Sequence, residues 1–135
     1  MTYRIAHETP SVEDYIRLRR EGGLGPFTEE AAKAGLAGSW FSVCVKDGER
    51  TVGMGRIIGD GGCFFQIVDI AVEPACRGKG LGKQIMAALV GYFKENAPQS
   101  AYVSLIADLP ADRLYAQFGF KPVAPRSIGM AMKTP

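Results

Sequence analysis

The sequence predicts an α/β fold in which a central mixed sheet is flanked by helices, within a single domain that spans residues 1–135. Two observations carry this prediction. Short apolar strands separated by turns come first, and one turn holds Asp47-Gly48, a strong signal for an antiparallel hairpin. A long apolar strand, a glycine-rich loop and a long amphipathic helix come next, in the order of a crossover between parallel strands.

Local patterns justify each element of the first half of the chain. Helix spacing of Val12, Tyr15 and Ile16, with Ser11 as N-cap, predicts a first helix that ends at the glycines of residues 22–25. Gly53 and Gly55 predict a bulge or the close approach of a neighbour. The expected elements are a strand over residues 3–6, the helix after residue 11, a short helix over 28–36, and strands over 40–45, 51–58 and 63–72.

The second half continues the alternation of helices and strands. An amphipathic helix follows the glycine-rich loop, and Gly119-Phe120 turns the chain after a short helix. The expected elements are a helix over residues 79–95, a strand over 101–106, a helix over 111–118, and terminal strands over 121–124 and 128–132.

Composition favours a small cytoplasmic enzyme. A chain of 135 residues with 47% hydrophobic and 22% charged residues can bury one core, and a net charge of +2 gives no reason to expect a nucleic-acid partner. We expect no membrane span and no signal peptide, since no apolar run approaches about 18 residues. His7 is the only histidine, so we expect no metal, and Cys44, Cys63 and Cys76 are interpreted as small buried side chains.

The loop over residues 77–82, Arg-Gly-Lys-Gly-Leu-Gly, has the character of a phosphate site. Three glycines let the backbone approach a ligand, and the N-terminus of the next helix adds partial positive charge. The pattern is neither Gly-x-Gly-x-x-Gly nor the nucleoside triphosphate loop, because no Ser or Thr follows Lys83. A glycine-rich turn without a ligand is the alternative.

The form Arg/Gln-x-x-Gly-x-Gly/Ala, filled by Arg77, Gly80 and Gly82, resembles the loop with which the GNAT superfamily of N-acetyltransferases binds the pyrophosphate of acetyl-CoA. The resemblance covers nearly the whole chain, and it implies the GNAT fold and acetyl-CoA as acetyl donor. The resemblance implies that the side chains of Arg77 and Lys79 add positive charge to the pyrophosphate site. The alternative is that both are simply solvated at the start of the helix. The cofactor-binding residues that it implies are Ile70, Ala71, Val72, Arg77, Gly78, Lys79, Gly80, Leu81, Gly82, Lys83 and Asp108.

A second motif, Tyr115 followed by Gly119-Phe120, resembles the family segment whose tyrosine lies near the sulfur of CoA. The resemblance makes Tyr115 the candidate general acid. A phenol with a pKa of about 10 can protonate a thiolate whose conjugate acid has a pKa near 8.5. The alternative is a core aromatic packed with its helix neighbours. Where many members have Asn, this chain has Asp108, which cannot donate a hydrogen bond when ionised.

The base and the acceptor pocket leave more alternatives open. Asp69 is an acid inside an apolar strand, which suggests a catalytic base or a structural carboxylate bonded to nearby backbone. Glu73, interpreted as a solvated turn residue, and a water chain are the other candidate bases. Phe27, Trp40 and Arg126 are candidates to line the acceptor pocket, and Phe27 and Trp40 are equally open to packing roles. An aromatic wall with one cation would suit an amine that also bears a carboxylate or an apolar group.

The sequence thus predicts an N-acetyltransferase that moves acetyl from acetyl-CoA to a primary amine, expected to be a small molecule, in a ternary complex. The N–H of Ile70 would polarise the thioester carbonyl. Acetylation of protein or peptide amines is one alternative, and a noncatalytic acyl-CoA-binding module is another. A homodimer is allowed by strand edges expected near the C-terminus and by the habit of the family; no nucleic acid or membrane is expected.

Overall fold

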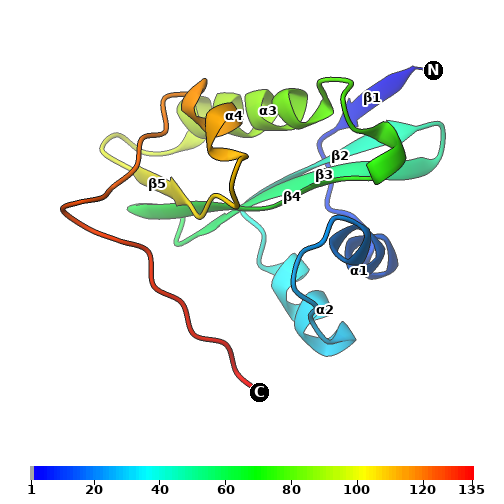
Figure 1. Cartoon of the computed structure of the whole chain (residues 1–135), viewed down its shortest axis with the longest axis horizontal. Coiled ribbons are helices and arrows are strands. Elements are labelled where there is room, and N and C mark those ends of the chain that lie inside the picture. Colours follow the sequence, from blue (N-terminus) through cyan, green and yellow to red (C-terminus); the bar gives the residue numbers. More distant parts are fainter. Residues whose placement is uncertain (1) are drawn as a thin grey trace.

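A five-stranded sheet runs through the protein, with its strands in the order β1-β2-β3-β4-β5. The structure is a computed structural model that describes residues 2–135 (Figure 1). Its elements are β1 (Tyr3–Ala6), α1 (Val12–Glu21), α2 (Glu29–Ala37), β2 (Phe41–Asp47), β3 (Arg50–Gly59), β4 (Phe64–Val72), a 3₁₀ turn η1 (Pro74–Cys76), α3 (Leu81–Asn96), β5 (Tyr102–Leu105) and α4 (Asp112–Ala116).

The pairing of the strands confirms the predicted mixed sheet. Strands β1 to β4 pair antiparallel through successive connections, and β5 pairs parallel to β4 after the α3 crossover. The β3–β4 turn is fixed by Asp60, whose carboxylate accepts hydrogen bonds from the N–H groups of residues 62, 63 and 64 at 2.8 to 3.1 Å. Ser11 and Thr28 cap α1 and α2, each accepting a backbone N–H bond at 3.1 Å.

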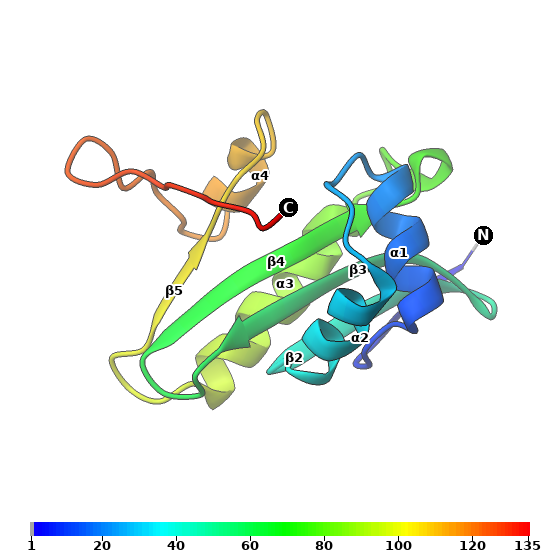
Figure 2. The same ribbon diagram turned by 90° about the horizontal axis from the view of Figure 1, so that it is seen from below.

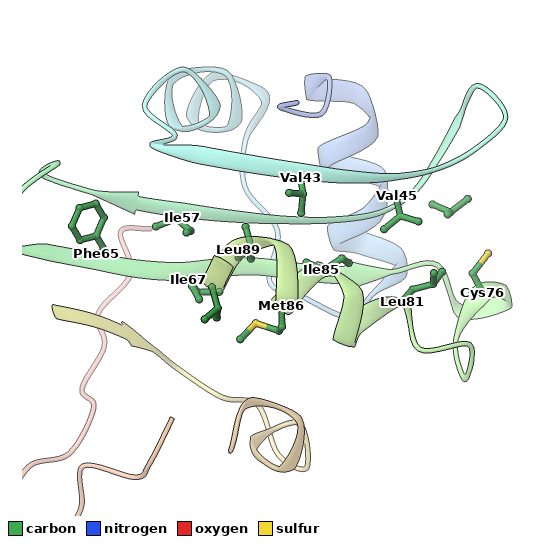
Figure 3. Close-up of a cluster of buried hydrophobic side chains, with 12 residues drawn as sticks. Val43, Val45, Ile57, Phe65, Ile67, Cys76, Leu81, Ile85, Met86 and Leu89 are labelled. Carbon is green, nitrogen blue, oxygen red and sulfur yellow. The ribbon is translucent and has the colours of Figure 1, made fainter. Parts of the chain in front are cut away.

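Helices cover both faces of the sheet (Figure 1). Helices α1 and α2 lie on one face, and α3 lies on the other with α4 at its side. The larger core lies between the sheet and α3, and it is centred on fully buried Ile57, Ile85 and Leu89 (Figure 3). A smaller cluster joins α1 and α2 to the opposite face through Tyr15, Leu18 and Met54, among others.

The predicted irregularity at the strand glycines is a β-bulge. Met54 pairs with Ala71 and Arg56 pairs with Val68, so Asp69 and Ile70 lie opposite the single residue Gly55. A side chain at Gly55 would meet the side chains of Ile85 at 2.6 Å and Ile70 at 2.8 Å. Only glycine therefore lets α3 and the bulged strand pack so close to β3.

Four sequence predictions are wrong. The terminal strands at 121–124 and 128–132 do not form: the sheet described within residues 2–135 ends at β5, and residues 117–135 pair with none of its strands. Cys63, expected to be buried, is exposed beside Phe64, which is 67% exposed, because α1 and α2 do not reach that end of the sheet (Figure 2). Glu73, expected to be solvated, is buried against Arg17 and Arg50, at 2.6 Å from each.

No helix within residues 2–135 is long and apolar enough to cross a membrane.

The glycine at the bulge gives a stability prediction with a matched control. We expect Gly55→Ala to lower the free energy of unfolding by about 1–3 kcal/mol, because the added methyl overpacks the contact with α3. Gly91 lies in α3 with open space at its Cβ position, so Gly91→Ala should raise the free energy of unfolding by about 1 kcal/mol through helix propensity. Urea unfolding of both variants measures this; equal effects would contradict the close approach.

Candidate functional site

The site begins where β5 separates from β4. Their pairing stops at Ile67 opposite Leu105, whereas β4 continues to Val72. Beyond that point the two strands diverge (Figure 2), and within the described chain the β5-side edge of residues 68–72 has no strand beside it. The carboxyl half of β4 thus offers backbone groups to a ligand as an added strand would receive them.

A pocket of about 350 Å³ lies along this free edge. Its walls come from the end of α1, the last residues of β4, the loop before α3, the first turn of α3, and α4. The lining residues are Gly22, Ile70, Ala71, Val72, Cys76, Arg77, Gly78, Gly80, Leu81, Gly82, Ala111, Leu114 and Tyr115. The structure therefore brings the predicted strand, the glycine-rich loop and the predicted tyrosine together around one cavity.

Several backbone N–H groups of the loop have no hydrogen-bond partner within residues 2–135. Gly78 and Gly80 have φ of +77° and +78°, and a Cβ at either would meet nothing within 4 Å, so conformation rather than space requires glycine there. The first bond within α3 runs from the N–H of Gln84 to the carbonyl of Gly80 at 3.1 Å. The N–H groups of residues 81, 82 and 83 come before this bond in the chain, so no helical hydrogen bond uses them.

The N–H groups at the start of the loop are not free. The N–H groups of Cys76 and Arg77 are used within the turn, where they bond to the carbonyls of Glu73 at 2.9 Å and Pro74 at 3.3 Å. Cys76 and Leu81 are buried at the end of the core where the loop begins and ends (Figure 3), which fixes both ends of the loop. The loop thus combines anchored ends with an open middle.

The basic side chains of the loop differ in their surroundings. Arg77 lines the pocket, and Lys83 is exposed in the first turn of α3. Lys79 is held away from the loop, with its Nζ 3.2 Å from the hydroxyl of Tyr3 and 5.6 Å from the centre of the same ring. The hydrogen bond to Tyr3 raises the pKa of Lys79, which keeps this side chain charged.

Tyr115 lies in the pocket wall on α4, half-buried beside Leu114. Burial raises the pKa of its phenol, and the negative charge of Asp108 adds to the increase. The hydroxyl is therefore protonated throughout the neutral range. Asp108 itself is exposed in the loop before α4, and its carbonyl accepts the N–H of Ala111 at 2.9 Å.

Asp69 is the centre of a buried ion cluster on the α1–α2 face of the sheet. Its side chain is 4% exposed and its backbone has φ of +62°, a left-handed conformation at the bulge. The carboxylate accepts a hydrogen bond from the Tyr15 hydroxyl at 2.9 Å, one from Arg56 Nε at 2.7 Å and one from Arg19. Both oxygens are occupied, and two guanidinium groups compensate the charge.

The arginines extend this cluster to the neighbouring elements. Arg56 donates to the carbonyl of Gly35 in the last turn of α2 at 3.0 Å, and Arg19 Nε donates to the carbonyl of Gly25 in the α1–α2 loop at 3.0 Å. Neither arginine is among the site residues predicted from the sequence. Their places on a helix face and inside an apolar strand were the available signals, because a buried arginine needs an anionic partner.

The three candidates for the acceptor pocket lie in different places. Phe27 lies beside the cluster: the guanidinium carbon of Arg19 is 4.4 Å from its ring centre, and Lys133 Nζ is 5.0 Å away. Trp40 packs between Phe65 and Tyr92, with ring centres 4.5 and 5.1 Å apart, and does not line the cavity. Its packing interpretation therefore fits the structure. Arg126 is exposed in the loop after α4 and is not part of the cavity wall.

Residues 2–135 hold no group of three or more His, Cys, Asp or Glu side chains that could bind a metal ion.

Comparisons with known proteins identify the family. The sequence model of the acetyltransferase (GNAT) domain matches residues 25–129. The crystal structure of SA2161 from meticillin-resistant Staphylococcus aureus, described as a protein of unknown function and probable acetyltransferase, is 47% identical; the match covers 98% of this chain and 100% of that one, with a TM-score of 0.94. The chain belongs to the GNAT family and is an acetyltransferase. No curated protein sequence matches it significantly.

More distant structures share the fold. Glucosamine-6-phosphate N-acetyltransferase from Arabidopsis thaliana is 18% identical, with a TM-score of 0.69 over all of both chains. The ribosomal-protein-S18-alanine N-acetyltransferase from Escherichia coli is 16% identical, with a TM-score of 0.76 over 91% of this chain and 80% of that one. At these identities the likeness concerns architecture alone, and the two named activities use different acceptors.

The loop gives a binding prediction with a control of the same chemistry. We expect Gly80→Asp to reduce acetyl-CoA affinity by roughly 100-fold or more, because a carboxylate would enter the anion site on a strained backbone. Gly61 has φ of +82° and equally open space, but it lies in the β3–β4 turn, so Gly61→Asp should suffer comparable strain and bind normally. Calorimetric titration with acetyl-CoA compares the two; equal affinities would exclude the loop from binding.

Proposed function

We propose that this acetyltransferase transfers acetyl from acetyl-CoA to the primary amine of a small molecule, directly and within a ternary complex. The observation that carries the proposal is the cavity in which the free edge of β4, the glycine-rich loop and Tyr115 meet. A strand edge suits the amides of an extended pantetheine arm, and a helix N-terminus with free N–H groups suits a pyrophosphate. Acetyl-CoA supplies the activated acetyl group, as a thioester.

The residues of the cavity take up separate tasks in this proposal. Ile70, Ala71 and Val72 would hold the pantetheine arm through their backbone, and the N–H groups of residues 78–83 would hold the pyrophosphate, with Arg77 adding charge. The N–H of Ile70, at the bulge, would stabilise the carbonyl oxygen as it gains charge during attack. Most of the rate enhancement then comes from orienting the thioester and the amine.

Tyr115 is the proposed catalytic acid. The amine nitrogen forms a bond to the acetyl carbon, the carbon–sulfur bond breaks, and the leaving thiolate takes a proton from the Tyr115 hydroxyl. Burial and Asp108 raise the pKa of the phenol, so the hydroxyl keeps its proton at neutral pH and can donate it to the thiolate as the carbon–sulfur bond breaks. Asp108 stands where many members of the family have asparagine, and its role in this proposal is to raise the pKa of Tyr115.

For Asp69, the contacts of its carboxylate favour a positioning role over the role of base. Tyr15, Arg19 and Arg56 occupy both oxygens, and proton transfer from an ammonium ion would need a free one. Glu73 is likewise held by Arg17 and Arg50. A water chain is the remaining route by which the amine loses its proton.

The acceptor side supports a small amine over a peptide. Lys133 Nζ donates to the carbonyl of Pro26 at 2.7 Å, so the C-terminal tail reaches the α1–α2 loop, where it would narrow the space open to a peptide. Phe27 lies between this lysine and Arg19. An aromatic ring beside a lysine suits an amine that also carries a carboxylate or a phosphate.

Release of CoA thiol across a panel of amines tests the proposal. We expect turnover with small amines that carry an anionic group, and a fall in kcat of roughly 100-fold in Tyr115→Phe with little change in KM. Tyr92→Phe is the control, because Tyr92 packs against Phe41 and Trp40 outside the cavity. The kcat of the wild-type enzyme should fall as the pH rises through the raised pKa of Tyr115, since the phenol loses its proton there. Asp108→Asn removes a negative charge that raises this pKa, so it should move the fall in kcat to lower pH. Turnover only with peptide amines would overturn the proposed acceptor.

The role of Asp69 has its own test. As a positioning residue, Asp69→Asn should lower the free energy of unfolding by about 3–5 kcal/mol, because it leaves two buried guanidinium groups without their counter-charge. The rise of kcat/KM with pH should keep its midpoint, because the amine alone titrates there. Tyr15→Phe removes one hydrogen-bond donor to Asp69, so it should lower the free energy of unfolding by about 1.5–3 kcal/mol. The midpoint of its pH profile should likewise stay unchanged. If Asp69→Asn kept the stability of wild type but no longer showed the rise of kcat/KM with pH, Asp69 would be the base.

A further inference from the structure

Lys133 places a primary amine beside the α1–α2 loop. The C-terminal tail, defined as residues 121–135, runs after α4 to the side of the sheet that carries α1 and α2 (Figure 1). There the Nζ of Lys133 donates to the carbonyl of Pro26 at 2.7 Å and lies 5.0 Å from the ring centre of Phe27. A Cβ at Gly25 would lie 3.6 Å from the same nitrogen. The amine thus lies against three successive residues of the loop.

The α1–α2 loop leads from this amine to the reaction centre of the proposed function. Gly22, where the loop begins, lines the cavity. The guanidinium carbon of Arg19 lies 4.4 Å from the ring centre of Phe27, and the same guanidinium bonds to Asp69 in the bulge of β4. Contacts through Phe27 and Arg19 therefore connect the Lys133 amine with the bulge at which the thioester carbonyl would be held.

Lys133 is bound to the loop by little. Within residues 2–135 its ammonium forms no ion pair with a carboxylate, and its hydrogen bond goes to the neutral carbonyl of Pro26. By contrast, Lys46 pairs with Glu8 at 3.6 Å and donates to the hydroxyl of Thr51 at 2.7 Å. Lys133 is exposed, so water can replace its one hydrogen bond. The amine can therefore leave Pro26 readily.

We propose that Lys133 is itself an acceptor: with acetyl-CoA bound and no substrate amine present, the enzyme acetylates the Nζ of Lys133 in the same chain. The neutral Nζ forms a bond to the acetyl carbon and loses one hydrogen as a proton to water. The carbon–sulfur bond breaks, the thiolate takes the proton of Tyr115, and water returns a proton to Tyr115. The products are acetyl-lysine and CoA. The inference rests on the proposed transfer from acetyl-CoA to an amine, and it adds a modification site to it.

The attachment of Lys133 to the enzyme favours transfer within one chain. An amine on a short flexible segment has an effective concentration in the millimolar range at a site that it can reach. It therefore reacts when free amine is scarce, and a bound substrate amine excludes it. Acetylation removes the charge of Lys133 and with it the cation–π contact to Phe27. The modified enzyme should bind an anionic acceptor less tightly.

Labelled acetyl-CoA tests the inference. Wild-type enzyme incubated with deuterated acetyl-CoA and no amine should acquire one acetyl group per chain, which peptide mass spectrometry should locate at Lys133. The initial rate per chain should not depend on enzyme concentration, and an added substrate amine should slow it. Lys133→Arg should remove the label, whereas Lys121→Arg, at another exposed lysine of the tail, should retain it. Unlabelled acetyl at Lys133 of the purified enzyme counts equally if Gly80→Asp lacks it.

Several results would overturn the inference. They are the absence of acetyl at Lys133, equal labelling of Lys121, labelling that Gly80→Asp retains, and a rate per chain that rises with enzyme concentration. The panel of amines distinguishes this failure from failure of the proposed function. Turnover of a small amine without acetyl at Lys133 would remove self-acetylation alone, whereas the absence of both reactions would remove both.

The acceptor provides a second readout. Lys133→Gln carries a neutral side chain, as the acetylated enzyme does. We expect its KM for the best anionic amine of the panel to exceed that of unacetylated wild type by roughly threefold to tenfold, with little change in kcat. Lys121→Gln loses the same charge at a lysine that makes no cation–π contact in residues 2–135, so it is the control. Equal KM values for the two variants would place Lys133 outside the acceptor site and overturn the inference.

Discussion

The carboxylate of Asp69 is the constraint on which the rest of the site depends. It lies at the one residue of β4 with a left-handed backbone, and it binds a hydroxyl from α1, an arginine from α1 and an arginine from β3. The second arginine continues to the last turn of α2, and the first continues to the α1–α2 loop. One buried charge thus joins four elements, and its removal would leave two unpaired cations beneath the sheet.

The bulge that this cluster stabilises sets the geometry of the ligand side. Two residues of β4 opposite the single Gly55 increase the twist of the strand. Strand β5 stops pairing at Leu105 and β4 continues alone, so a free backbone edge lies next to the loop before α3. The loop needs its glycines for left-handed conformations at Gly78 and Gly80, whereas Gly55 is needed for space. Different glycines therefore serve the same pocket for different physical reasons.

Local signals in the sequence were sufficient for most of the fold. The helix caps at Ser11 and Thr28, the hairpin at Gly48, the irregularity at Gly55 and the crossover around the loop all follow from nearby residues. The failures concern contacts between distant residues. The roles of Arg19 and Arg56 depend on Asp69 being brought under α1, and the burial of Glu73 depends on Arg17. The tail has strand-like alternation, but a strand also requires a neighbour, which pattern alone does not supply.

The same distinction explains how the two ends of the sheet differ. At the β4 carboxyl end, as elsewhere in residues 2–135, every buried side-chain polar atom has a hydrogen-bond partner. At the β5 margin the exposed groups are apolar side chains and a free backbone edge, which cost little in hydrogen bonds while they face water but gain from being covered. The contact between Lys133 and the α1–α2 loop brings the C-terminal segment to Phe27, on the side from which the amine would approach in the proposed reaction.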